Sequence, residues 1–183
     1  MDFKKNGKYA IVGKSGRGKS TILKIIMGII KDYDGDVLYD GRIRQRALDT
    51  NMSYISQDIY LFNATIKENI CMGADFSDKA INDAIIKSSL YNDIKNFTDG
   101  IDTLVGENGA NISGGEKQRI ALARSLINGK EIILIDEGTS SLDRENRRLI
   151  EENLLKDKNL TIIMVSHNLD ETIKELFDKI YEI

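Results

Sequence analysis

The sequence predicts an α/β fold in which a mostly parallel sheet is flanked by helices and carries an inserted helical subdomain. Short apolar stretches at residues 9–12, 131–135 and 160–165 have the length of buried strands. Segments with helical spacing of apolar residues separate these strands. A mostly helical stretch from residue 61 to residue 127 interrupts the alternation, which indicates an insertion.

Composition supports one folded domain and excludes several classes of protein. The chain has 183 residues, of which 41% are hydrophobic, enough to bury a sizeable core. The formal net charge of −3 gives no overall positive field that would attract nucleic acid, so we expect no nucleic-acid partner. Cys71 is the only cysteine and cannot form an internal disulfide, and we expect it to be a small buried residue. The apolar runs are too short to span a membrane.

The first strand leads into a helix over residues 19–30, whose apolar side chains nearly encircle it, so we expect burial on most sides. Gly35 and Gly41 indicate a hairpin region, and a short strand follows at residues 52–56. The later elements, in order, are a helix at 78–90, a glycine-rich break at 100–115, a strand at 131–135, a charged helix at 144–156, a strand at 160–165, a helix at 169–177 and a terminal strand at 179–183.

A phosphate-binding loop follows the first strand. Residues 13–20 read GKSGRGKS, with glycines that let successive N–H groups point inward at a helix amino terminus. Lys19 is placed to reach the β- and γ-phosphates of a nucleotide. Ser20 offers a hydroxyl to Mg²⁺, which prefers hard oxygen ligands. The core is therefore expected to be that of a P-loop NTPase.

Two adjacent carboxylates end a second apolar strand. Residues 132–137 read IILIDE, and successive strand side chains point to opposite faces, so Asp136 and Glu137 have different tasks. Asp136 is placed to hold Mg²⁺, directly or through water. Glu137 is placed to orient or deprotonate an attacking water.

A third segment opens the helix that closes the insertion. Ser113 and Glu116 fit a capping box, in which each side chain accepts from a backbone N–H at the helix start. A cap does not explain Gly114 and Gly115, each of which weakens a helix by roughly 1 kcal/mol relative to alanine. Backbone N–H groups that approach an anion closely would explain them.

With these segments in order, the chain resembles the nucleotide-binding domain of ABC transporters over nearly its whole length. Residues 13–20 resemble the Walker A motif, 132–137 Walker B and 113–116 the signature sequence. Gln57 is similar to the Q-loop glutamine, residues 140–143 to the D-loop and His167 to the switch histidine. Residues 61–70 and 105–109 resemble exporter-type domains.

The resemblance implies one domain over residues 1–183, with a RecA-like core at 1–60 and 128–183 and a helical subdomain at 61–127. It implies ATP and Mg²⁺ as cofactors and ATP hydrolysis as the activity. The implied catalytic residues are Glu137, His167, Lys19 and Gln57. The implied metal-binding residues are Ser20, Asp136 and Gln57. The implied ATP-binding residues are Gly13, Ser15, Gly16, Gly18, Lys19, Ser20, Thr21, Ser113, Gly114 and Gly115.

The resemblance also implies partners. Two such domains, identical or different, pair head to tail, so that each ATP lies between Walker A of one and the signature of the other. A transmembrane domain of an exporter is the second partner, which places the domain at the cytoplasmic face of the cell membrane, held there through that partner or a parent chain. The sequence of such a domain does not specify the transported substrate, because the substrate contacts the membrane helices.

The chain departs from the family pattern at four places. We expect the first strands and the aromatic residue that stacks on adenine to be missing, because only twelve residues precede Gly13. The sequence also stops early after its last strand. Glu116 stands where the signature usually has glutamine, and Gly138 where the family more often has proline or alanine.

These departures leave a second function open. In that alternative the chain is a truncated module that binds ATP weakly and pairs with a partner domain but does not hydrolyse the ATP. A third alternative is the SMC-type chromosome and repair ATPases, which share the motifs but insert a long coiled coil. The short stretch between Ser20 and Ser113 argues against that alternative.

Overall fold

A parallel sheet forms the centre of the molecule. The computed structural model describes residues 1–39, 41–43, 51–137, 144–167 and 169–183. Within these residues the main sheet has five strands in the order β4-β5-β6-β1-β7, and each neighbouring pair is parallel. All the strands therefore end at the same edge, and the predicted α/β class is confirmed. The strands are β1 (Lys8–Val12), β4 (Met52–Ile55), β5 (Ile132–Asp136), β6 (Thr161–Ser166) and β7 (Lys179–Glu182).

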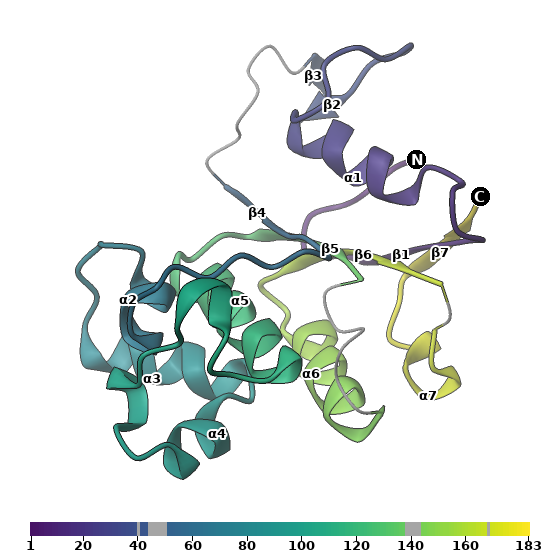
Figure 1. Ribbon diagram of the computed structural model, residues 1–183. Helices are drawn as coiled ribbons and strands as arrows, with labels where there is room; N and C mark the ends of the chain where they lie inside the picture. Colours follow the sequence, from purple (N-terminus) through teal and green to yellow (C-terminus); the bar gives the residue numbers. More distant parts are fainter. Residues whose placement is uncertain (40, 44–50, 138–143, 168) are drawn as a thin grey trace.

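Helices cover both faces of this sheet, as Figure 1 shows: α1 lies on one face, and α5, α6 and α7 lie on the other. Side chains alternate between the two faces along each strand. In β5, Leu134 packs with Leu23 of α1, whereas Ile135 packs in the cluster that contains Ile150 of α6. Burial on both sides explains why these strands are continuously apolar. The helices are α1 (Lys19–Met27), α5 (Gly114–Ile127), α6 (Arg144–Lys156) and α7 (Glu171–Lys174).

The first helix is shorter and less buried than the sequence predicts. α1 ends at Met27, because Gly28 adopts φ 77° and its N–H bonds back to the carbonyl of Ile25. Leu23 is fully buried, whereas Ile29, beyond the helix end, is 54% exposed. Because α1 covers only one face of the sheet, the prediction of a helix over 19–30 buried on most sides is wrong.

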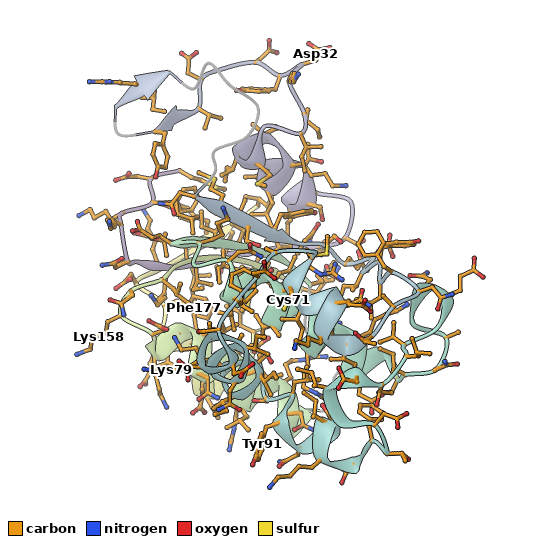
Figure 2. All side chains as sticks on the ribbon, turned by 90° about the vertical axis from the view of Figure 1, so that its left-hand side faces the viewer. Asp32, Cys71, Lys79, Tyr91, Lys158 and Phe177 are labelled. Carbon is orange, nitrogen blue, oxygen red and sulfur yellow. The ribbon has the colours of Figure 1, made fainter. Side chains whose placement is uncertain are left out.

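Residues 61–127, here called the helical region, have an apolar core of their own. Side chains of α2, α3 and α5 pack there, with Leu90 and Val105 from the connections. Cys71 is 8% exposed in this core, and burial raises the pKa of its thiol, so the prediction of a buried cysteine is confirmed. In Figure 2, Cys71 lies toward the middle of the molecule and Tyr91 at its outer edge. The elements are α2 (Ile66–Cys71), α3 (Asp78–Lys87), α4 (Tyr91–Asn96), the 3₁₀ turns η1 (Gly100–Asp102) and η2 (Glu107–Gly109), and α5.

The other predicted elements are present with shifted bounds. The hairpin consists of β2 (Leu38–Tyr39) and β3 (Arg42–Ile43), which pair antiparallel. β5 and β6 each begin and end one residue later than predicted. The helix predicted at 169–177 is the single turn α7, while α6 matches its prediction. The division into core and helical subdomain at residues 61 and 127 stays a prediction.

Candidate functional site

The loop between β1 and α1 has a backbone suited to binding an anion. Gly16 and Gly18 have φ of 78° and 85°, left-handed values that favour glycine. Gly18 precedes α1, and no side chain of the described residues caps this end of the helix. A Cβ at Gly13 would clash with the carbonyl oxygen of Ile183, so close packing also requires glycine there. The first N–H groups of α1 are therefore directed to a ligand site rather than to a cap.

Lys19 folds back over this loop. Its side chain is almost completely buried, and Nζ donates to the carbonyl oxygens of Gly13, at 2.8 Å, and Lys14, at 3.0 Å. The same Nζ lies 3.4 Å from Nδ1 of His167. A buried ammonium group held by carbonyl dipoles places positive charge at the loop.

An open hollow lies beside the loop. Basic side chains of Lys14, Arg17 and His167 line it, together with Glu182 from the end of β7. The hollow is at the edge where the parallel strands end, which is the usual place for ligands in open α/β sheets. Ser15 and Thr21 lie on the exposed side of the same segment.

Ser20 and Asp136 are in direct contact. Ser20 Oγ donates to Oδ1 of Asp136 at 2.7 Å, and the hydroxyl of Tyr54, from β4, donates to Oδ2 at 2.7 Å. Asp136 is 3% exposed, so its carboxylate depends on these protein donors. Burial, and then the hydrogen bond to Asp136, raise the pKa of Tyr54 above its ordinary range, which keeps the hydroxyl protonated as a donor. A serine hydroxyl beside a buried carboxylate is a pair of hard oxygen groups suited to Mg²⁺.

Glu137 and His167 form a second polar pair. Nε2 of His167 lies 2.7 Å from Oε1 of Glu137. Because Lys19 donates toward Nδ1, the geometry fits a neutral imidazole that accepts at Nδ1 and donates from Nε2. Glu137 has φ 52°, an uncommon backbone for this residue type.

Within the described residues, no hydrogen bond or ion pair joins Gln57 or the amino end of α5 to this group of side chains. Gln57 follows β4 with an exposed side chain and makes no hydrogen bond to Ser20 or Asp136. The amino end of α5 lies in the helical region, on the other side of the molecule from the loop before α1 (Figure 1). Gly138 and the D-loop segment 140–143 lie outside the described residues.

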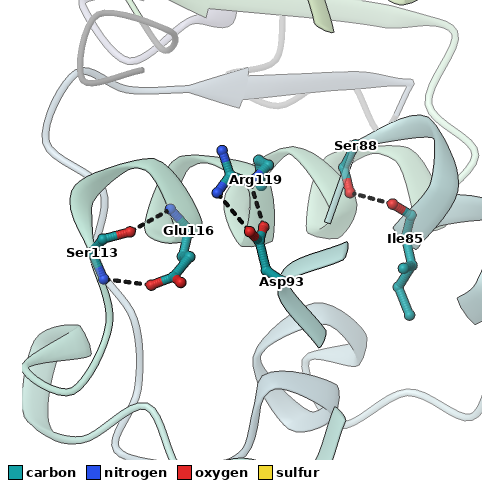
Figure 3. Close-up of polar contacts among 6 residues, drawn as sticks. All are labelled: Ile85, Ser88, Asp93, Ser113, Glu116 and Arg119. Atoms are coloured by element: carbon teal, nitrogen blue, oxygen red, sulfur yellow. Dashed lines mark hydrogen bonds and ion pairs between the residues drawn. The ribbon is translucent and has the colours of Figure 1, made fainter. Parts of the chain in front are cut away.

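The capping box at the amino end of α5 is present. Ser113 N–H donates to Glu116 Oε2 at 2.6 Å, and Glu116 N–H donates to Ser113 Oγ at 3.3 Å (Figure 3). The glutamate that departs from the family pattern thus satisfies a backbone donor. Ser113 and Gly114 are exposed, so this end of α5 is open to contact from outside.

Tyr54 is the residue of the site that the sequence alone did not single out. Strand alternation could have found it, because Tyr54 and Asp136 lie near the ends of adjacent strands on the face that α1 covers. An aromatic residue in an apolar strand gave no sign that its hydroxyl has a carboxylate partner.

Comparisons with known proteins agree with this geometry. The family model described as ABC transporter matches residues 1–140. An ATP-dependent lipid A-core flippase of Francisella tularensis subsp. holarctica (strain OSU18) is 35% identical over 176 residues, which cover 92% of this chain and 29% of that protein. ATP-binding cassette sub-family B member 6 of Xenopus tropicalis is 40% identical over 170 residues, which cover 90% of this chain and 20% of that protein.

A solved structure shows the same fold. It is the structure of a bacterial Atm1-family ABC exporter with ATP bound, with a TM-score of 0.90 and 34% identity. The match covers all of this chain and 33% of that one. The chain therefore spans a third or less of the length of these relatives.

The parallel sheet and the loop between β1 and α1 define a P-loop nucleotide-binding protein. With the family model matching more than three quarters of its length, the chain belongs to the ABC transporter family. The predicted resemblance to the nucleotide-binding domain of an ABC exporter is confirmed. Within the described residues, no helix has the length and apolar character needed to cross a membrane.

Proposed function

We propose that this chain binds ATP and hydrolyses it to power export across a membrane, as the nucleotide-binding domain of an ABC exporter. One observation carries the proposal. Lys19, Ser20, Asp136, Glu137 and His167 come from three separate parts of the chain and meet at the carboxyl edge of the sheet through the contacts described above. A merely structural strand-to-helix turn would not require a buried ammonium, a buried carboxylate and a glutamate–histidine pair at one edge.

The N–H groups of the loop and Lys19 Nζ bind the phosphates of the nucleotide in this proposal, because Lys19 Nζ bonds to the loop carbonyls and basic side chains line the hollow beside the loop. Ser15, Gly16, Gly18 and Thr21 belong to the same loop and helix start.

Mg²⁺ fits the donors present. Ser20 Oγ and Asp136 Oδ1, already 2.7 Å apart, are the two oxygens that would hold it, with Gln57 as a further ligand from the loop after β4. When bound, Mg²⁺ neutralises negative charge that develops on the phosphate oxygens.

Glu137 and His167 act on the attacking water in this proposal. The carboxylate of Glu137 accepts a proton from the water or fixes its orientation for in-line attack. His167 donates from Nε2 to Oε1 of Glu137, which holds the carboxylate in place. Most of the catalytic effect is then positioning and electrostatic stabilisation.

A second domain completes the site. Ser113, Gly114 and Gly115 begin α5, which lies on the opposite face of the sheet from α1 (Figure 1), so in this proposal they serve the nucleotide of a partner domain, identical or related, packed head to tail. Hydrolysis then opens the pair, and the exporter's transmembrane domain receives the motion at the cytoplasmic face of the membrane. The names of the flippase and of the Atm1-family exporter support this assignment.

The test is the rate of Mg²⁺-dependent ATP hydrolysis by the purified chain, measured as a function of its concentration. We expect the rate to rise faster than linearly, because two chains form each site, and to be lost in Glu137→Gln. Glu171→Gln is the matched control, since this exposed glutamate pairs with Lys174 on α7, away from the site.

Two results would contradict the proposal. Nucleotide binding without turnover at any concentration would instead support a non-catalytic binding module. Equal rates in the unmodified chain and in Glu137→Gln would show that the hydrolysis does not come from this site.

A further inference from the structure

The hydroxyl of Tyr54 enters the site from a strand that carries none of the loop or carboxylate motifs. In the parallel pair of β4 and β5, Tyr54 lies opposite Leu134, two residues before Asp136. Residues two apart on a strand share a face, so Tyr54 and Asp136 both lie on the side that α1 covers. Ile55 and Ile135, one residue on, pack on the opposite side.

Tyr54 provides one of the two hydrogen bonds that hold the buried carboxylate. Oδ1 of Asp136 accepts from Ser20 and Oδ2 accepts from Tyr54, each at 2.7 Å. With Asp136 only 3% exposed, loss of either donor leaves one oxygen without its protein partner.

The two donors differ in what else they can do. Ser20 lies at the start of α1, beside the phosphate-binding loop, and its hydroxyl is the group proposed to turn to Mg²⁺. Tyr54 is anchored in a strand, and its ring packs with the apolar cluster beneath α1. Its hydroxyl can stay on Oδ2 while Oδ1 faces the metal.

We propose that Tyr54 is a positioning residue for magnesium-dependent nucleotide binding, because its hydroxyl fixes the carboxylate of Asp136 in the orientation that the metal requires. This inference rests on the proposed function. Tyr54 acts through Asp136 and touches neither the metal nor the nucleotide. Loss of its hydroxyl should therefore reduce the gain in nucleotide affinity that Mg²⁺ brings and leave the affinity without Mg²⁺ unchanged.

The test compares Tyr54→Phe with Tyr181→Phe. Both changes remove only a hydroxyl, and Tyr181 bonds through its hydroxyl to the backbone of Asp2, away from Asp136. Binding of a fluorescent ATP analogue is measured twice for each protein, in excess Mg²⁺ and in EDTA. The dissociation constant in EDTA divided by that in Mg²⁺ gives the gain in affinity that Mg²⁺ brings. Thermal unfolding without ligand shows whether each variant is folded.

We expect Tyr54→Phe to lower that ratio about tenfold, since a hydrogen bond to a charged group is worth roughly that factor in an equilibrium constant. Affinity in EDTA stays at the unmodified value, and Tyr181→Phe changes neither. In an Asp136→Asn background, Tyr54→Phe should have no further effect on the ratio, because the carboxylate it positions is gone.

The inference is overturned if Tyr54→Phe keeps the unmodified ratio, or if it weakens binding equally with and without Mg²⁺, as a packing defect would. An effect of Tyr54→Phe that persists in Asp136→Asn also overturns it. A failure of the unmodified chain to bind nucleotide in either condition is a different result. It would refute the proposed function, and this inference with it.

Discussion

The imidazole of His167 is in contact with the carboxylate of Glu137, with 2.7 Å between Nε2 and Oε1. His167 directly follows β6 and Glu137 directly follows β5, which are neighbouring strands, and Glu137 has a left-handed backbone with φ 52°. The glutamate is 16% exposed in its side chain and the histidine 43%, so one partner is sheltered and the other faces the hollow. This pairing gives the first prediction.

His167→Ala should lower ATP turnover about a hundredfold, because Glu137, the proposed base, loses the donor that holds its carboxylate, and a positioned base contributes about 10²–10⁴. Nucleotide affinity should change less than about threefold, because Lys19 keeps its bonds to the loop carbonyls. The measurement is the turnover rate at saturating ATP beside a binding titration. Unchanged turnover would remove His167 from the catalytic group, and no second histidine exists to take its place.

Lys19→Met removes the ammonium group while keeping much of the side-chain length. We expect ATP affinity to fall at least about tenfold, since hydrogen bonds to charged groups contribute roughly 1.5–3 kcal/mol. Lys24→Met, in the last turn of the same helix, is the control and should bind normally. Equilibrium binding of a fluorescent ATP analogue checks the prediction, and equal affinities in the two variants would contradict it.

Two capping boxes allow the fold and the function of α5 to be separated. Ser113 caps α5 and Thr65 caps α2, each with a glutamate three residues later that bonds back to the cap. Ser113→Ala and Thr65→Ala should each lower the free energy of unfolding by about 1 kcal/mol. Only Ser113→Ala should also lower ATP turnover. Denaturant unfolding and turnover are measured on both variants, and equal turnover would assign Ser113 a structural role alone.

Arg119 and Asp93 join α5 to α4 through two hydrogen bonds, 2.5 Å from Nε to Oδ2 and 3.0 Å from Nη2 to Oδ1 (Figure 3). Their side chains are only 10% and 19% exposed. Breaking the pair with Asp93→Ala should cost about 3 kcal/mol of unfolding free energy, because it leaves a mostly buried guanidinium without its partner. Replacing both, with Arg119→Met and Asp93→Ala, should recover part of that loss, because no unpaired buried charge remains. A double-mutant cycle of unfolding free energies, measured by denaturant unfolding, tests this prediction. Additive losses would argue against a coupled pair.

Much of the fold follows from local sequence. Apolar strands of four to six residues, helical spacing between them and the glycine-rich loop predict a parallel sheet with ligands at its carboxyl edge. The capping box at Ser113 was predicted in full, because both partners lie within one helical turn. α6 was predicted at about 144–156 as a charged helix between two apolar strands, and it spans Arg144–Lys156.

Other features depend on contacts between distant residues. The sequence of α1 does not say that only one side meets the sheet, so its degree of burial was predicted wrongly. The contacts of Tyr54 with Asp136 and of Glu137 with His167 join residues 82 and 30 positions apart and depend on strand order. The roles proposed for these residues stay predictions until they are measured.

α5 belongs to two apolar cores at the same time. Leu122 packs with the sheet and α6, whereas Ala123 and Ile127 pack within the helical region. The helix has 14 residues and is about 21 Å long at 1.5 Å per residue. Its buried residues begin at Gln118, whereas Ser113 and Gly114 at its amino end are exposed. A tilt of about 10° about Gln118, which is roughly 7 Å from Ser113 at 1.5 Å per residue, moves the exposed end by about 1 Å. A shift of that size lengthens a hydrogen bond at the exposed end beyond its normal range, so a change in the packing of either core reaches the contacts made there.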